Sequence, residues 1–188
     1  FVIAVCGTHG KTTTTAMIAK MLEDTGLDPT VLLGAIVPWW EANYRVGKGK
    51  YFVVEADEFN DNFLPLKPNI TVVTNIEMDH PEYFKDFNAY KESFKKFLSQ
   101  TNGTIVANTS DPVVSEVLAF HPKGVNVIED YSKKLIDFNP GIPGGFNKFN
   151  ASAAFQVGLL LRIDPTLIKK SLSNYNGVGR RFEYLGDF

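Results

Sequence analysis

The first residues of the chain are Phe1-Val2-Ile3-Ala4-Val5-Cys6-Gly7-Thr8-His9-Gly10-Lys11-Thr12-Thr13, and they indicate its fold class. Residues 1–6 form a continuous apolar run, which is typical of a strand buried on both faces. Residues 12–23 follow with a helical pattern, and Gly26 stands where that helix should stop. A strand, a glycine-rich turn and a helix in this order predict a βα unit that binds a polyphosphate.

The turn of this unit consists of Gly7, Thr8, His9, Gly10, Lys11, Thr12 and Thr13. Glycines allow backbone N–H groups to approach phosphate oxygens, the lysine reaches the outer phosphates, and a hydroxyl binds Mg²⁺. The full Walker pattern has a glycine where Val5 stands, so the match is to a shorter Gly-x-x-Gly-Lys-Thr loop. The alternative is a glycine-rich turn without a ligand, but the order of strand, triplet and helix favours the nucleotide site. At His9 we expect the backbone N–H to matter more than the ring.

The rest of the chain alternates between strand and helix patterns. Short apolar runs occupy residues 31–33, 51–55, 70–74, 104–107 and 125–128, and helical patterns occupy residues 86–99, a segment from 111, 147–161 and 165–173. Strands that alternate with helices predict one α/β domain with a doubly wound, mostly parallel sheet. Trp39, Trp40 and Tyr44 form either a binding patch or a loop folded over the core, and we expect the loop.

Charged side chains follow two of the predicted strands. Glu55 is the first charge after the third apolar run, and the carboxyl ends of parallel strands meet at one crevice, so Glu55 could hold Mg²⁺ there. The next acids, Asp57, Glu58 and Asp61, are interpreted as a solvated acidic loop. His80 ends the segment after the fourth strand and is either a metal ligand or a surface imidazole. Taken alone, its position favours the surface.

Two late segments carry polar groups suited to a nucleotide. Asn147 and Asn150 open a helix, where their amides could contact a base or ribose, or could cap the helix. Arg180 and Arg181 follow Gly179 and fit either a phosphate contact or an ordinary surface turn. The spacing leaves both pairs of alternatives open.

Composition excludes several classes of protein. Nineteen Lys and Arg against 21 Asp and Glu give a net charge of -2, which argues against non-specific binding of nucleic acid. The apolar runs are too short to span a membrane, and a single cysteine, Cys6, cannot form an intramolecular disulfide, so we expect a cytoplasmic protein. Because a core strand begins at Phe1, we expect the sequence to be part of a longer polypeptide with neighbouring domains.

Five motifs, at residues 7–13, 55–58, 74–80, 147–150 and 179–182, resemble those of the Mur ligase family in the same order. The resemblance covers nearly the whole chain. It implies an ATP-dependent ligase that forms an amide bond through an acyl phosphate, and it is greatest to the members that join L-alanine to UDP-N-acetylmuramate for peptidoglycan synthesis. The alternatives are a ligase for recycled murein peptide, a folate or cyanophycin relative, or a nucleotide-binding module without catalysis.

The resemblance also implies roles for individual residues. Lys11 would hold the β- and γ-phosphates, Thr12 and Glu55 one Mg²⁺, and His80 a second metal, so that Lys11, Glu55 and His80 serve catalysis. Asn150, together with Asn147, would contact adenine. Arg181 would contact a phosphate.

The same resemblance predicts the domain organisation. Residues 1–188 would be the central ATP-binding domain, and residues after about 180 would lead toward a C-terminal domain. The UDP-sugar and the amino acid would be held mostly by flanking domains outside this chain.

The chain departs from the family in three places. Phe146 stands where the family usually has His, so part of the base contact should differ. Residues 128–145 are too few for the small antiparallel sheet usual in this region, which we expect to be missing or reduced to one strand. Some relatives use a carbamylated lysine, and neither Lys91 nor Lys95 is assigned that role.

Overall fold

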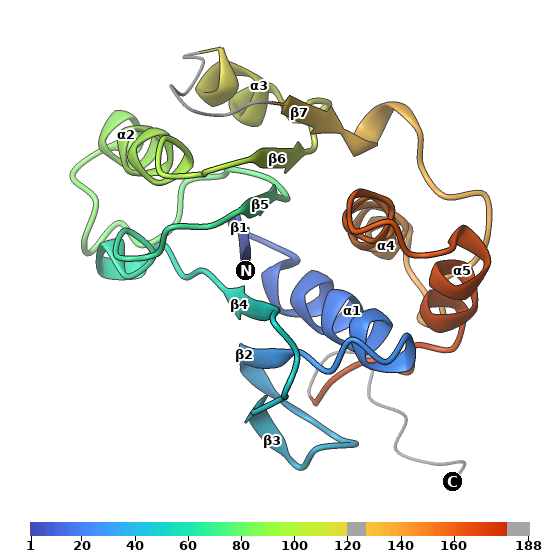
Figure 1. Cartoon of the computed structure of the whole chain (residues 1–188). Coiled ribbons are helices and arrows are strands. Elements are labelled where there is room, and N and C mark those ends of the chain that lie inside the picture. The colour runs from blue at the N-terminus through green and yellow to red at the C-terminus, as the bar shows by residue number, and fades with distance from the viewer. Residues whose placement is uncertain (120–126, 180–188) are drawn as a thin grey trace, which may run out of the picture.

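A computed structural model describes residues 1–119 and 127–179, and it shows a single sheet between two layers of helices (Figure 1). The strands are β1 Val2–Cys6, β2 Thr30–Val37, β3 Ala42–Arg45, β4 Phe52–Glu55, β5 Ile70–Val73, β6 Thr104–Ala107 and β7 Val127–Asp130. Their order across the sheet is β3-β2-β4-β1-β5-β6-β7.

Neighbouring strands run parallel except at one edge, where β3 pairs antiparallel with β2. β1 lies between β4 and β5, so the turn that follows β1 sits at the point where successive connections leave toward opposite edges. Ligands of open α/β sheets bind at this point, beyond the carboxyl ends of the strands. The predicted doubly wound, mostly parallel α/β fold is confirmed.

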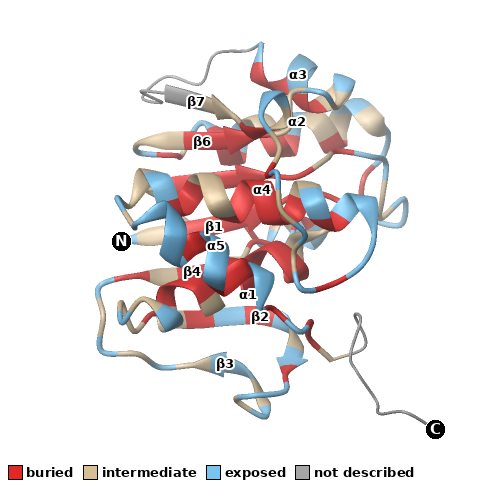
Figure 2. Ribbon diagram, turned by 90° about the vertical axis from the view of Figure 1, so that its right-hand side faces the viewer, coloured by how far each residue is buried: buried red, intermediate tan, exposed pale blue. Residues whose placement is uncertain are grey.

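The helices divide between the two faces of the sheet (Figures 1 and 2). They are α1 Lys11–Asp24, α2 Phe87–Leu98, α3 Pro112–Leu118, α4 Gly145–Leu160 and α5 Pro165–Ser173, with short 3₁₀ turns η1 Phe59–Asp61 and η2 Tyr131–Lys133. One core joins α1, α4 and α5 to one face, and a second joins α2 and α3 to the other. Along β1, Ile3 and Val5 enter the first core while Ala4 and Cys6 enter the second, which explains the continuous apolar run.

Local sequence sets the helix starts. Asp86, Asp111 and Asp164 each accept hydrogen bonds from backbone N–H groups in the first turn of α2, α3 and α5. These caps satisfy donors that have no partner within the helix. In α3 and α5 a proline occupies the first turn, where its missing N–H costs nothing.

The sequence did not reveal β3. The chain turns at residues 38–41 and returns as a short strand that carries an exposed Tyr44, so these residues form a hairpin. Trp40 packs against the first core, as a loop folded over the core would, and its indole N–H donates to Glu23. A four-residue edge strand with polar residues lacks a periodic signal, because its pairing with β2 is a tertiary contact.

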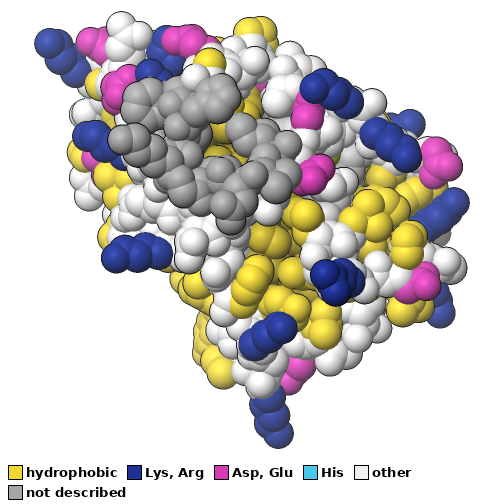
Figure 3. Space-filling model, turned by 45° about the horizontal axis from the view of Figure 1, so that its top comes forward, with side chains coloured by type: hydrophobic (Ala, Val, Ile, Leu, Met, Phe, Trp, Pro, Cys, Tyr) yellow, Lys and Arg dark blue, Asp and Glu magenta, His cyan; other side chains and the backbone are white. Residues whose placement is uncertain are grey.

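Two further expectations concern the surface and the segment before α4. Within residues 128–145, all of which the structure describes, the only strand is the end of β7, which pairs parallel with β6, so no small antiparallel sheet forms there. Figure 3 shows one face of the molecule, on which Lys and Arg are scattered among acidic side chains. Within residues 1–119 and 127–179, no helix has the length and hydrophobicity to cross a membrane.

Candidate nucleotide-binding site

The glycine-rich loop connects the end of β1 to α1 and packs against the segment after β5. Gly7 adopts a φ of 126°, and a Cβ there would lie 2.1 Å from Thr74 Oγ1. Gly10 has a φ of 85°, and a Cβ there would lie 2.5 Å from Asn150 Oδ1. Both positions therefore require glycine, for backbone conformation and for space. The close packing at Gly10 brings α4 against the start of α1.

Asn75 holds the loop in place from the end of β5. The N–H of Thr8 donates to its carbonyl oxygen at 2.9 Å, and the N–H of His9 donates to its Oδ1 at 2.9 Å. The His9 side chain is exposed and lies 3.5 Å from a Glu77 carboxylate oxygen. A ligand oxygen that accepted a hydrogen bond from the His9 N–H would therefore have to compete with Asn75 Oδ1. Asn75 lies in the motif at residues 74–80, but no feature of the sequence distinguishes it as a site residue.

Lys11 lies across its own loop rather than projecting into solvent. Its Nζ donates to the carbonyl oxygen of Gly7 at 2.7 Å and lies 2.8 Å from Oε2 and 3.0 Å from Oε1 of Glu58. Glu58 is fully buried. The interpretation of Glu58 as part of a solvated acidic loop is wrong, because the turn at η1 directs its side chain inward to the lysine.

Tyr90, on α2, contacts both Glu58 and the loop through its hydroxyl group. Its hydroxyl donates to Glu58 Oε1 at 3.1 Å and lies 3.1 Å from Thr8 Oγ1. Burial raises the pKa of the Tyr90 phenol, and the nearby Glu58 charge adds to this, so the hydroxyl keeps its proton and remains a donor. Nothing in the spacing of the aromatic residues of α2 distinguished Tyr90 from the core residues around it.

Thr12 and Glu55 come together at the start of α1. The Thr12 hydroxyl donates to Glu55 Oε1 at 2.8 Å, and the N–H of Gly34 donates to Glu55 Oε2 at 2.6 Å. A hydroxyl and a carboxylate are oxygen donors of the kind that Mg²⁺ prefers, so this pair fits the expected cation. Thr13 is buried in the first turn of α1, as Thr12 is.

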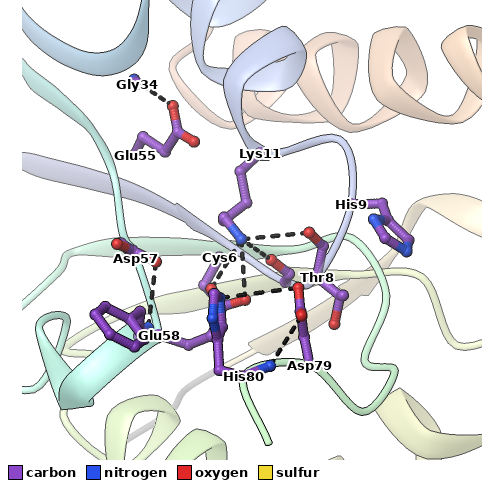
Figure 4. Close-up of polar contacts among 12 residues, drawn as sticks. Cys6, Thr8, His9, Lys11, Gly34, Glu55, Asp57, Glu58, Asp79 and His80 are labelled. Atoms are coloured by element: carbon purple, nitrogen blue, oxygen red, sulfur yellow. Dashed lines mark hydrogen bonds and ion pairs between the residues drawn. The ribbon is translucent and has the colours of Figure 1, made fainter. Parts of the chain in front are cut away.

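His80 belongs to a different group from Glu55. Potential ligand atoms of His80, Asp57 and Glu58 all lie within 4.8 Å of one another. Figure 4 shows Glu55 directed toward Gly34, whereas His80 lies near Glu58. Among the described residues, no hydrogen bond or ion pair joins His80 to Glu55. The structure thus brings together Thr12 with Glu55, and His80 with the buried Glu58 and with Asp57, which is exposed as expected.

A cavity of about 730 Å³ opens beside the loop, large enough for the base and ribose of a nucleotide. His9 and Gly10 line it on the loop side, and Phe146 and Asn150 line it on the α4 side. Asn150 donates to Oδ1 of Asn147, which is itself fully buried and donates to the Pro143 carbonyl. Asn150 therefore faces the cavity, while Asn147 positions it. Arg180 and Arg181 lie outside the described residues.

The sequence was also compared with models of known protein families. The model of the Mur ligase middle domain matches residues 5–134. The chain belongs to the Mur ligase family.

Several Mur ligases are similar to the chain in sequence or in fold. It is 40% identical over 212 residues to the UDP-N-acetylmuramate--L-alanine ligase of Caldicellulosiruptor saccharolyticus, covering 98% of this chain and 47% of the relative. It is 38% identical to the enzyme of the same name from Xylella fastidiosa, covering 98% of this chain and 44% of the relative. The solved UDP-N-acetylmuramate-alanine ligase of Thermotoga maritima superposes with a TM-score of 0.81 at 27% identity, over 99% of this chain and 47% of that one. The chain thus spans about half the length of these Mur ligases.

Proposed function

We propose that the chain is the ATP-binding domain of a ligase that joins L-alanine to UDP-N-acetylmuramate. The observation that carries the proposal is the arrangement around one loop: Lys11 lies on it, the Thr12 and Glu55 pair lies at its end, and the nucleotide-sized cavity opens beside it. Relatives of 36–40% identity that bear this activity in their names support the choice of substrates.

The nucleotide would lie across the start of α1. The first N–H groups of an α-helix have no partner within the helix, so those of α1 are available to phosphate oxygens. Lys11 would contact the outer phosphates, and Thr12 and Glu55 would hold Mg²⁺, which neutralises charge on the transferring phosphoryl group. Asn150 would contact adenine in the cavity, with Phe146 beside it.

Two further assignments complete the proposal. His80 would hold a second cation apart from Glu55, with the exposed Asp57 beside it. Arg181 would reach a phosphate. The UDP-sugar and the amino acid would bind flanking domains of a longer polypeptide that this chain does not include.

The proposed reaction has two steps. An oxygen of the UDP-N-acetylmuramate carboxylate attacks the γ-phosphorus of ATP, and ADP leaves. The amine of L-alanine then attacks the acyl carbon, phosphate leaves, and the nitrogen loses a proton. Positioning of the reactants and stabilisation of charge on the phosphoryl group would be the main contributions of this domain.

Ligation of a recycled murein peptide is the second candidate. The ligase of UDP-N-acetylmuramate and L-alanyl-γ-D-glutamyl-meso-diaminopimelate from Neisseria superposes with a TM-score of 0.84, over 95% of this chain and 67% of that one. Its identity of 24% shows the shared fold alone. The same domain could therefore serve either amine substrate, since the amino acid binds elsewhere.

Titration calorimetry with Mg-ATP tests the nucleotide site. Lys11→Ala should weaken binding about ten- to hundredfold, because a charge-assisted contact with phosphate is worth roughly 1.5–3 kcal/mol. Lys20→Ala, on the same helix and paired with Asp24 at the surface, is the matched control and should bind as the wild type does. Equal affinity of the Lys11→Ala variant and the wild type would show that Lys11 and its loop do not contribute to ATP binding.

Activity of the full-length parent tests the reaction. Phosphate release from ATP should require both UDP-N-acetylmuramate and L-alanine. Release with a murein peptide instead of L-alanine would select the second candidate, and nucleotide binding without any release would indicate a non-catalytic module.

A further inference from the structure

Lys11 and Glu58 form a close ion pair with both carboxylate oxygens on the lysine. The lysine has three N–H donors, and its Nζ lies within hydrogen-bond distance of the carbonyl oxygens of Gly7 and Thr8 and of both Glu58 oxygens. The Lys11 side chain is 13% exposed and that of Glu58 is 0% exposed. Every donor of the lysine therefore has an acceptor within the protein, which a phosphate would have to replace or share.

Packing fixes the Glu58 carboxylate, so it cannot easily move together with the Lys11 side chain. Its carboxylate is fully buried, and the Tyr90 hydroxyl donates to Oε1 from α2 (Figure 4 shows the lysine end of this group). Tyr90 is itself fully buried between Phe84 and Phe94, whose ring centroids lie 4.8 and 5.1 Å from its own. The negative charge is thus fixed in place by packing, whereas the lysine is the long, flexible partner.

A polyphosphate must compete with this fixed charge. The phosphate and the Glu58 carboxylate are both anions that seek the same ammonium group, and in a poorly solvated site their mutual repulsion is weakly screened. Binding of phosphate by Lys11 therefore requires the lysine either to leave Glu58 or to hold two anions at close range. In both cases the free energy of phosphate binding becomes less favourable, because either the contact between Lys11 and Glu58 is lost or two anions are held close together.

We infer that Glu58 is a positioning residue that holds Lys11 across the loop and competes with the polyphosphate for it, so that Glu58 lowers the affinity of the free domain for nucleotide. The inference rests on the proposed function. Tyr90 acts through Glu58 by keeping its carboxylate at the lysine. The ion pair would thereby order the loop and neutralise the charge of Lys11 when no nucleotide is bound.

Glu58→Gln tests the inference because the amide keeps the size of the side chain and removes its charge. We expect Mg-ATP and inorganic tripolyphosphate to bind about three- to thirtyfold more tightly by calorimetry, since a charged competitor is lost. The melting temperature of the free protein should fall in the same variant. If Glu58 were merely structural, the variant would lose both affinity for Mg-ATP and melting temperature. A gain in affinity together with a fall in melting temperature therefore identifies the competition.

Two variants serve as comparisons. Glu77→Gln removes the same charge from an exposed side chain near the loop, and it should leave both affinities unchanged because exposed charges are screened. Tyr90→Phe keeps the ring but removes both the donor to Glu58 and the contact with Thr8 of the loop, so it should tighten binding less than Glu58→Gln does. This variant keeps the inference testable if the Glu58→Gln protein does not fold.

The outcomes separate the two proposals. Tighter binding by Glu58→Gln and Tyr90→Phe supports the inference. Unchanged or weaker binding by these variants, in a protein whose wild type binds Mg-ATP through Lys11, overturns the inference and leaves the proposed function intact. Failure of the wild type and of every variant to bind either probe overturns the proposed function and the inference with it.

Discussion

Removal of Lys11 should expose the energetic cost of burying Glu58. We consider Lys11→Met, which keeps much of the apolar stem of the lysine and removes its charge. In this variant the Glu58 carboxylate would remain fully buried with the Tyr90 hydroxyl as its remaining donor in the group described above. A buried charge without its counter-ion is one of the few single-site changes that strongly destabilise a protein.

The structure sets the size of the effect. Breaking a buried ion pair from one side typically costs about 3–5 kcal/mol. Here the lysine is 13% exposed and Tyr90 still donates to the carboxylate, so we expect a loss of about 2–4 kcal/mol in the free energy of unfolding. Glu58→Gln should cost less, about 1–2 kcal/mol, because the remaining lysine can turn toward solvent.

The double variant Lys11→Met with Glu58→Gln completes a mutant cycle. It leaves neither charge unpaired, so its loss should be smaller than the sum of the single losses by about 1–3 kcal/mol. Urea unfolding at pH 7, followed by circular dichroism, measures all four proteins, and equal m-values would show that the unfolded states are comparable. Lys20→Met, which breaks a surface pair with Asp24, should cost less than about 0.5 kcal/mol. Additive losses in the cycle would refute the reasoning.

Three further predictions concern the loop, the sheet and the catalytic step. Gly7→Ala should abolish measurable binding of Mg-ATP by calorimetry, because its Cβ would lie 2.1 Å from Thr74 Oγ1 and its φ of 126° is unfavourable for alanine. Burial alone would raise the pKa of Asp130, but hydrogen bonds from Ser132 and Thr109 outweigh it and lower the pKa to about 2. Asp130→Asn should therefore cost about 2 kcal/mol of stability at pH 7, and this loss should shrink as the pH falls from about 4 to 2 in urea-unfolding experiments. In the full-length parent, Glu55→Ala should lower kcat much more than it raises the KM for ATP in steady-state kinetics, because charge on the phosphoryl group develops in the transition state; an unchanged kcat would exclude Glu55 from the mechanism.

Much of the fold was predictable because its signals are local. Continuous apolar runs located six of the seven strands in the described part of the sheet, and Asp86 and Asp111 correctly marked the starts of α2 and α3. β3 was missed, since its residues gain their conformation from pairing with β2. The strand order also required the structure, because periodicity shows that a strand is buried but not which strands are its neighbours.

The site divides in the same way. The glycine-rich loop and the helix that follows it were predictable, because a βα turn and a helix start are built by neighbouring residues. The lack of space for a Cβ at Gly7 and Gly10 was not, because it comes from Thr74 and Asn150, which are distant in the chain. Which acid contacts which partner depends on packing between segments that are distant in the chain. Glu55 and Glu58 stand three positions apart, yet one contacts Thr12 and the other is buried against Lys11. A single turn after β4 sends the two carboxylates to different sides of the lysine, and the environment that each then meets comes from helices and strands distant in the chain.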